Sequence, residues 1–184
     1  NNVAGHYLDK GFNVKFKYEP KNNNRPNLAV GFDDFAGTGL LTKEYIVATQ
    51  NLRDIKVTAG LGWGKFTGEN SFDNPFSFLS DKFNFRPSTS SNYSSGGTLS
   101  YDKWFKGNAS LFGGLEYFIP NQSGLSIKLE YDPYDYLDFS ALNRVDASFD
   151  LRKKDSNINI GFSYPFNKFL TIDASFIKGN TFNL

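Results

Sequence analysis

The sequence predicts an all-β protein, an antiparallel up-and-down transmembrane β-barrel of about ten strands, where roughly eight are enough to close a small barrel. The first observation is a two-residue alternation of apolar and polar side chains, which places the two kinds on opposite faces of a strand. The alternating segments run to about nine residues, and a tilted strand needs ~9–11 to cross the hydrocarbon layer of a membrane. Aromatic residues such as Tyr18, Trp63 and Tyr117 also gather near segment ends, where barrels carry interfacial girdles.

Six segments alternate along their whole length, and no charged residue falls on their apolar side. In the first of them Val14 and Phe16 alternate with Lys15 and Lys17. A helix would mix these two kinds of residue, so the alternation indicates strands. The six segments are residues 11–19, 55–64, 125–132, 145–152, 157–164 and 170–176.

Weaker strands and short connections complete the expected meander. The weaker strands are residues 27–33, 43–50, 97–104 and 109–118. Short polar connections, at 51–53, 153–156 and 165–168, are typical of hairpins. Residues 181–184 begin another alternating strand of only four residues. Its unpaired backbone N–H and C=O groups would be costly in lipid. We therefore expect residues 1–184 to be a single barrel domain or a fragment of a larger barrel.

The exception to the meander is a long loop, residues 67–96, which is rich in Ser, Asn, Gly and Phe. Asn74 followed by Pro75 is typical of a helix N-cap and first helical position, so residues 75–82 are expected to form a short helix. The loop either folds into the lumen as a plug or constriction, or lies outside the membrane.

The strand period alone does not distinguish a barrel from a soluble sandwich. In a sandwich the apolar faces turn inward onto a second sheet, whereas in a barrel they face lipid and the polar faces line a lumen. Strand length, the aromatic residues and the polar faces favour the barrel. A soluble carbohydrate-binding β-sandwich remains an alternative.

On the barrel interpretation, charged side chains of the polar faces line the lumen. These candidates are Lys15, Lys17, Lys56, Lys128, Glu130, Asp132, Asp146, Asp150 and Arg152. Three tyrosines, Tyr131, Tyr134 and Tyr136, stand beside acidic residues, a combination that suits the stacking of sugar rings. The same tyrosines are also typical of an aromatic belt at the membrane interface.

The residues carry no catalytic or metal-binding motif. His6 is the only histidine and the chain has no cysteine, so a Ser-His-Asp triad or a histidine metal site would rest on one residue. We predict no enzyme activity, no metal and no cofactor. Residues 60–64 alternate glycine with Leu61 and Trp63, which predicts a smooth wall or room for a bulky neighbour such as Phe66 rather than a phosphate loop.

Composition is compatible with one β domain. The chain has 184 residues, 17% of them aromatic, and a mean hydropathy of −0.45. Its formal net charge of +1 gives little field to attract nucleic acid. No apolar run approaches the ~18 residues of a membrane-spanning helix.

Several sequence motifs, in one order over nearly the whole chain, resemble the YjbH family of outer-membrane proteins of exopolysaccharide and capsule operons. The motifs are DFAGTGL at 34–40, EYIVAT at 44–49, LGWG at 61–64, NPF at 74–76, LSDKF at 79–83, WFKG at 104–107, ASLFGGLEY at 109–117, KLEYD at 128–132 and KGNT at 178–181. Residues 133–152 follow the family poorly, and family members are longer at both ends.

The resemblance implies a β-barrel in the outer membrane of a Gram-negative bacterium, serving secretion or assembly of an extracellular polysaccharide. The implied partners are outer-membrane lipids, the polysaccharide, and the periplasmic and lipoprotein products of an exopolysaccharide operon, with no nucleic acid. A polar lumen would conduct or guide the polymer. A general diffusion porin with no polymer role is the alternative within the same fold.

Overall fold

The computed structural model describes residues 11–22, 24–36, 41–68, 70–87, 99, 101–122, 124–134 and 154–184. These residues form one antiparallel sheet of nine strands, ordered as they follow in the chain. The strands are β1 Val14–Tyr18, β2 Asn27–Asp33, β3 Lys43–Leu52, β4 Ile55–Gly64, β5 Ala109–Phe118, β6 Ser126–Tyr131, β7 Ile158–Pro165, β8 Thr171–Ile177 and β9 Thr181–Asn183. The predicted all-β class and up-and-down order are therefore confirmed.

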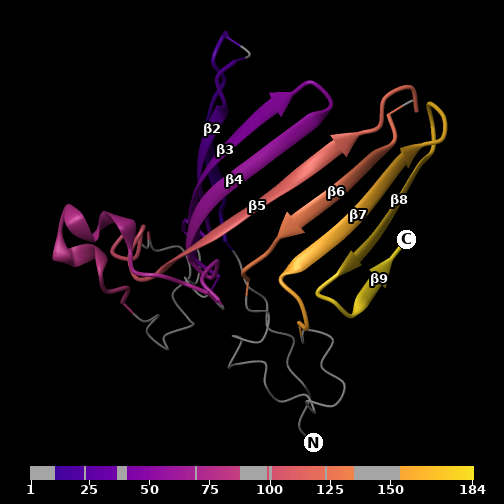
Figure 1. Cartoon of the computed structure of the whole chain (residues 1–184). Coiled ribbons are helices and arrows are strands. Elements are labelled where there is room, and N and C mark those ends of the chain that lie inside the picture. Colours follow the sequence, from indigo (N-terminus) through magenta and orange to yellow (C-terminus); the bar gives the residue numbers. More distant parts are fainter. Residues whose placement is uncertain are drawn as a thin grey trace, which may run out of the picture.

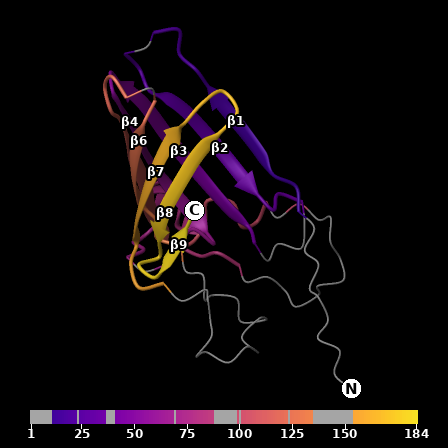
Figure 2. The ribbon, with the colours of Figure 1, turned by 90° about the vertical axis from the view of Figure 1, so that its right-hand side faces the viewer.

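The sheet is curved but is not closed. Figure 1 shows the strands side by side from β2 to β9, and Figure 2, viewed from the β9 side, shows the first strands lying behind the last ones. In the described part of the chain, β1 and β9 are the two edges and do not pair with each other. The closed barrel that the sequence predicts is not confirmed.

The strand register gathers the alternating residues into two faces of opposite character. One row across β1 to β5 pairs Lys15, Gly31, Tyr45, Gly62 and Ser110 in turn. We call the side of the sheet with this row the polar face. The neighbouring row pairs Phe16, Val30, Ile46, Leu61 and Leu111, and we call its side the apolar face. The alternation predicted from the sequence thus holds across hydrogen-bonded neighbours as well as along each strand.

Most of the apolar face is open. Phe16 is 65% exposed, Leu129 47% and Phe162 41%. Among the described residues there is one sheet only, so nothing corresponds to the second layer that a β-sandwich requires. The large apolar side chains in the middle of this face therefore meet whatever medium surrounds the sheet.

Two of the predicted strands are not among the nine strands of the sheet. Residues 97–104 were expected to form a strand, but residues 101–105 form turns. The reason is tertiary packing, because the chain must turn there to bring the rings of Trp104 and Phe105 onto Phe32, and Phe105 has a positive φ of 54°. The strand expected at 145–152 lies outside the described residues.

The helix expected at 75–82 is replaced by two 3-10 turns, Pro75–Phe78 and Asp81–Phe83. The predicted cap is present, since the Asn74 side chain accepts a hydrogen bond from the Phe76 amide at 2.9 Å and Pro75 occupies the first position. Across the described residues, no helix has the length and apolar character needed to cross a membrane.

Candidate functional site

The charged residues predicted to line a lumen share the polar face where the structure describes them. Lys15 and Lys17 lie on β1, Lys56 on β4, and Lys128 and Glu130 on β6, and the strand register places all five on the polar face. Asp132 directly follows β6, and its carboxylate accepts a hydrogen bond from the Tyr134 amide at 2.9 Å. Asp146, Asp150 and Arg152 lie outside the described residues.

Over β4 to β6 the polar face is hollowed, and its charges neutralise one another. The hollow has a volume of about 360 Å³. On its wall Glu116 pairs with Lys56 at 3.4 Å and with Lys128 at 3.8 Å. Glu130 accepts a hydrogen bond from the Asn159 amide at 3.0 Å. This part of the face offers many polar groups but no excess of one charge.

Over β1 to β4 a second hollow of about 320 Å³ has a different lining. Its charged residues are Lys15, Lys17 and Lys56, and within the described part of the chain no carboxylate lines it. The remaining polar residues of the lining are Asn27, Thr49 and Asn51. We call this the lysine hollow.

Three aromatic rings form a cluster on the polar face that sequence reasoning did not identify as a site. The rings of Phe66 and Phe112 stack with their centroids 5.0 Å apart, and Tyr45 meets both at near right angles. The Lys43 ammonium lies 5.1 Å from the centroid of the Phe66 ring, within range of a cation–π interaction. Aromatic faces next to charged and hydroxyl groups can stack on the apolar side of a sugar ring while its hydroxyls are hydrogen-bonded.

Glycines create the space for this cluster. A Cβ atom on Gly62 would lie 2.5 Å from Phe66, and one on Gly60 would lie 2.3 Å from Phe112. A Cβ on Gly31 would lie 2.1 Å from Tyr45. Of the two alternatives predicted for residues 60–64, room for a bulky neighbour such as Phe66 is confirmed at Gly62, while Gly60 leaves room for Phe112.

The three candidate tyrosines do not form one group. Tyr131 lies on the apolar face, opposite Gly113 and Ile158, and its hydroxyl accepts a hydrogen bond from Asn70 at 3.3 Å. Tyr134 lies at the end of the polar face, with the Lys43 ammonium 5.9 Å from its ring centroid. Tyr136 lies outside the described residues. Whether any of them stacks on sugars or sits at an interface stays a prediction.

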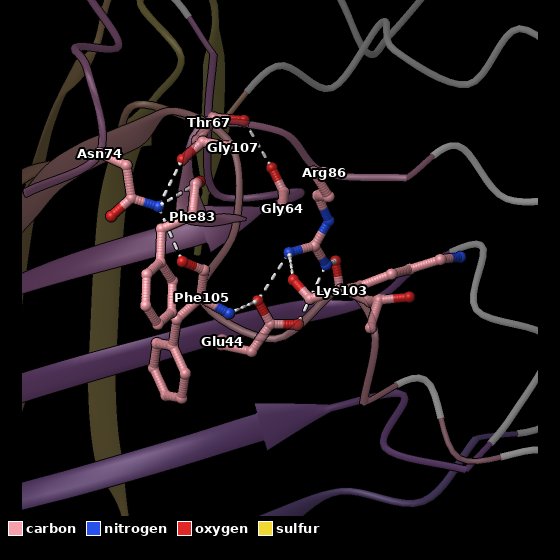
Figure 3. A network of polar contacts seen from close by, with 10 residues as sticks. Glu44, Gly64, Thr67, Asn74, Phe83, Arg86, Lys103, Phe105 and Gly107 are labelled. Carbon is pink, nitrogen blue, oxygen red and sulfur yellow. Dashed lines mark hydrogen bonds and ion pairs between the residues drawn. The ribbon is translucent and has the colours of Figure 1, made fainter. Parts of the chain in front are cut away.

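A buried ion pair ties the connection between β4 and β5 (residues 65–108) to the sheet (Figure 3). Arg86 donates to the two carboxylate oxygens of Glu44 at 2.7 and 3.0 Å, and the Phe105 amide donates to Glu44 at 3.1 Å. Arg86 also donates to the carbonyls of Lys103 at 2.8 Å and Thr42 at 3.2 Å. Glu44 lies on β3 at a position that belongs to the apolar face and is fully buried, so it is a charge on the apolar face that this connection covers.

The same connection shields Trp63, which is fully buried. Its ring stacks on Phe76 with centroids 5.4 Å apart and meets Phe105 edge-on at 5.1 Å. The prediction that Trp63 belongs to an exposed interfacial girdle is therefore wrong, because the connection folds back over this end of the apolar face. The described parts of loop 67–96 thus contact the apolar face, while its role as a plug or an outer loop stays a prediction.

The connection contains two further polar groups, Asn74 and Lys103, of which Asn74 holds it in shape. The Asn74 amide nitrogen lies within 3.0 Å of the carbonyls of Phe83, Phe105 and Gly107, which brings two distant parts of the connection together (Figure 3). Burial lowers the pKa of Lys103 below its usual value, with Arg86 adding to this and the nearby carboxylates of Asp102, Asp34 and Glu44 opposing it.

Sequence reasoning missed Glu44 and Arg86, although one signal was present. Glu44 alternates with Ile46 and Ala48, so its position in the sequence already places a charge among apolar neighbours. A carboxylate on the apolar side of a strand requires a buried partner. Nothing in the sequence indicates that the partner is Arg86, which is 42 residues away in the chain.

Fold and faces together define a class: an antiparallel meander sheet with a hollowed polar face and an open apolar face. Residues 1–184 match the YjbH family model, described as "Exopolysaccharide biosynthesis protein YbjH", and the chain belongs to this family, as the sequence motifs predict. A relative from Escherichia coli strain K12, named "Uncharacterized lipoprotein YjbH", is 35% identical over 176 residues, or 96% of this chain. The chain spans 24% of that relative's length. No solved structure is significantly similar to it.

Proposed function

We propose that this chain forms part of the wall of an outer-membrane β-barrel that helps an exopolysaccharide reach or cross the membrane. The observation that carries the proposal is the open apolar face opposite a hollowed, charged polar face. Side chains such as Phe16 and Leu129 are stabilised when acyl chains cover them, at roughly 25 cal/mol for each Å² removed from water. A sheet with these two faces suits a wall between lipid and a water-filled lumen.

The family supports this location and role. The family description names exopolysaccharide biosynthesis, and the E. coli relative is named a lipoprotein, which is consistent with attachment to a membrane. On this proposal β1 and β9 pair with further strands of the whole protein, for which the much greater length of that relative leaves room. Pairing there would satisfy the edge amides and carbonyls that lipid leaves unbonded.

On this proposal the polar face guides the polymer through many weak contacts. Lysines and hydroxyls line both hollows, with carboxylates in the hollow over β4 to β6 and side-chain amides in the lysine hollow, so a hydrated chain can exchange one hydrogen bond for the next without a deep trap. The cluster of Tyr45, Phe66 and Phe112 adds ring faces among these groups. No reaction is needed for this role.

Adjacent residues on opposite faces provide a direct test of the environment. In the full-length protein reconstituted in lipid bilayers, a nitroxide label would be placed at Leu129 in one variant and at Lys128 in another. The two positions have similar exposure, 47% for Leu129 and 48% for the Lys128 side chain. We expect the label at 129 to collide with dissolved oxygen, as in lipid, and the label at 128 to collide with a water-soluble nickel complex. Water accessibility at both positions would refute the barrel wall.

The polymer role is tested separately in cells. Lys15, Lys17, Lys56, Lys128 and Glu130 would be replaced together by glutamine, with matched membrane levels of the variant and the unmodified protein. A control variant would replace Lys168, which lies in the exposed turn between β7 and β8. We expect the combined variant, and not the control, to lower the amount of secreted polysaccharide. Unchanged secretion together with altered uptake of small solutes would instead indicate a general diffusion porin.

A further inference from the structure

The lysine hollow differs from the rest of the polar face in its charge. Lys15 and Lys17 are two residues apart on β1, so both side chains leave the same face, and Lys56 reaches the hollow from β4. Between the lysines, small side chains such as Ala29 line the hollow and leave its volume unfilled. The volume of about 320 Å³ falls within the ~300–1,000 Å³ of small-ligand pockets.

The ion pairs around the hollow leave positive charge available. Lys15 has no ion-pair partner among the described residues, and Lys17 pairs only with Glu19, at an exposed edge. Lys56 shares Glu116 with Lys128 on the far side. Exposed pairs of this kind are weak, so an incoming anion can compete for the ammonium groups.

Neutral polar groups surround these ammonium groups. Asn27 and Asn51 offer both amide donors and carbonyl acceptors. The Thr49 hydroxyl lies 3.0 Å from the Thr58 hydroxyl and retains capacity for another hydrogen bond. Such groups match the hydroxyls of a sugar ring, while the lysines match an acidic substituent on the same ring.

We propose that the lysine hollow binds carboxylated sugar units, so that the polymer handled by this protein is an acidic polysaccharide. This inference rests on the proposed function and adds the substrate class. Each lysine acts as a point charge with three donors, which tolerates many orientations of a carboxylate and lets a moving chain engage and leave. The hollow over β4 to β6 lacks this preference because Glu116 and Glu130 offset its lysines.

The test is binding to the full-length protein in detergent micelles, measured by isothermal titration calorimetry at low salt. The probes are hexagalacturonate, which carries a carboxylate on each sugar, and maltohexaose, which is neutral and of equal length. We expect the acidic probe to bind more tightly by about tenfold, the size expected from two or three exposed ion pairs, and to lose this advantage as salt is added.

Matched variants locate the effect. Replacing Lys15 and Lys17 together by glutamine is expected to abolish the preference for hexagalacturonate, whereas Lys168→Gln, in the exposed turn between β7 and β8, leaves it within about twofold. Replacing Lys15 and Lys17 by arginine retains the charge and is expected to retain the preference, which guards against a mere loss of folding.

Three outcomes would overturn the inference. Equal affinity for both probes would mean sugar binding without charge selection, and binding of neither probe would mean no saccharide site here. An equal loss in the Lys168 variant would place the effect outside the lysine hollow. None of these results alters the secretion assay, so the proposed role in export stands or fails independently.

Discussion

Replacing Glu44 by glutamine is expected to loosen the β4–β5 connection from the sheet. The glutamine has nearly the same size as Glu44 but carries no charge, and its amide group is a donor where Arg86 and the Phe105 amide already donate. Arg86 would then keep its charge in a site where its side chain is only 18% exposed.

The expected cost follows from the burial of this pair. Removing one partner of a buried ion pair costs ~3–5 kcal/mol, because the other charge is left without compensation. The carbonyls of Lys103 and Thr42 still accept hydrogen bonds from Arg86, which favours the lower end of this range. A loss of about 3 kcal/mol corresponds to roughly a hundredfold increase in local opening.

Hydrogen exchange at the Phe105 amide measures that opening directly, since this amide is bonded to Glu44. The measurement uses the full-length protein in micelles, with Glu116→Gln as the control because Glu116 belongs to a more exposed ion pair. Exchange of the Phe105 amide should accelerate about a hundredfold in the Glu44 variant and remain within about threefold in the control.

The reasoning would be refuted by unchanged exchange at Phe105 in the Glu44→Gln variant. That result would mean that the aromatic packing of Trp63 and Phe76 holds the connection without help from the ion pair. A double variant with leucine at positions 44 and 86 gives a further check. Because apolar residues of similar volume can replace a buried pair at little cost, it should recover much of the lost stability in urea unfolding, a readout that does not depend on the Phe105 amide, which loses its acceptor in this variant.

Three further substitutions test other parts of the structure. Gly62→Leu should displace Phe66 and lower the melting temperature, because its Cβ would lie 2.5 Å from that ring, whereas Gly161→Ala, with its nearest neighbour at 3.5 Å, should be neutral. Asn74→Ala should destabilise the connection by about 2 kcal/mol in urea unfolding, since it loses a cap and several carbonyl contacts. The pKa of Lys103 is lower in the folded chain than in the unfolded chain, so the unfolded chain binds the proton more strongly. The free energy of unfolding should therefore rise with pH between that lowered pKa and 10.5, the usual value for lysine. Lys103→Met should remove this rise.

Each of these has an opposite outcome that counts against the argument. Equal melting temperatures for the two glycine variants would mean that the aromatic cluster does not depend on the space at Gly62. A wild-type urea midpoint for the Asn74 variant would assign the shape of the connection to other contacts. Parallel pH profiles for the Lys103 variant and the unmodified protein would place the titration on another group.

Much of the sheet could be predicted because strand alternation is a local property of the sequence. The bounds predicted for residues 27–33, 55–64 and 109–118 are those of β2, β4 and β5. The position of Lys15 and Lys128 on the polar face could also be predicted, because every second residue of a strand lies on the same face. Closure could not be predicted in the same way, since it depends on whether the two edge strands meet, which no local pattern encodes.

The connection between β4 and β5 shows where local patterns stop being informative. Residues 101–105 turn because Trp104 and Phe105 pack onto Phe32, a contact between distant parts of the chain. Likewise, Glu44 is a charge at an apolar position of an alternating strand, and only its ion pair with Arg86 in the folded chain explains it. Both features are decided by tertiary contacts that override local preference.

The strictly sequential pairing of the strands also limits how such a chain can change its length. Deleting or inserting one residue inside a strand would exchange the two faces for everything beyond that point in the strand, so lysines would be turned toward the apolar side. A two-residue change keeps the parity, and gain or loss of a whole hairpin keeps the pattern throughout. Length variation in this protein should therefore concentrate in the turns, or occur in even steps.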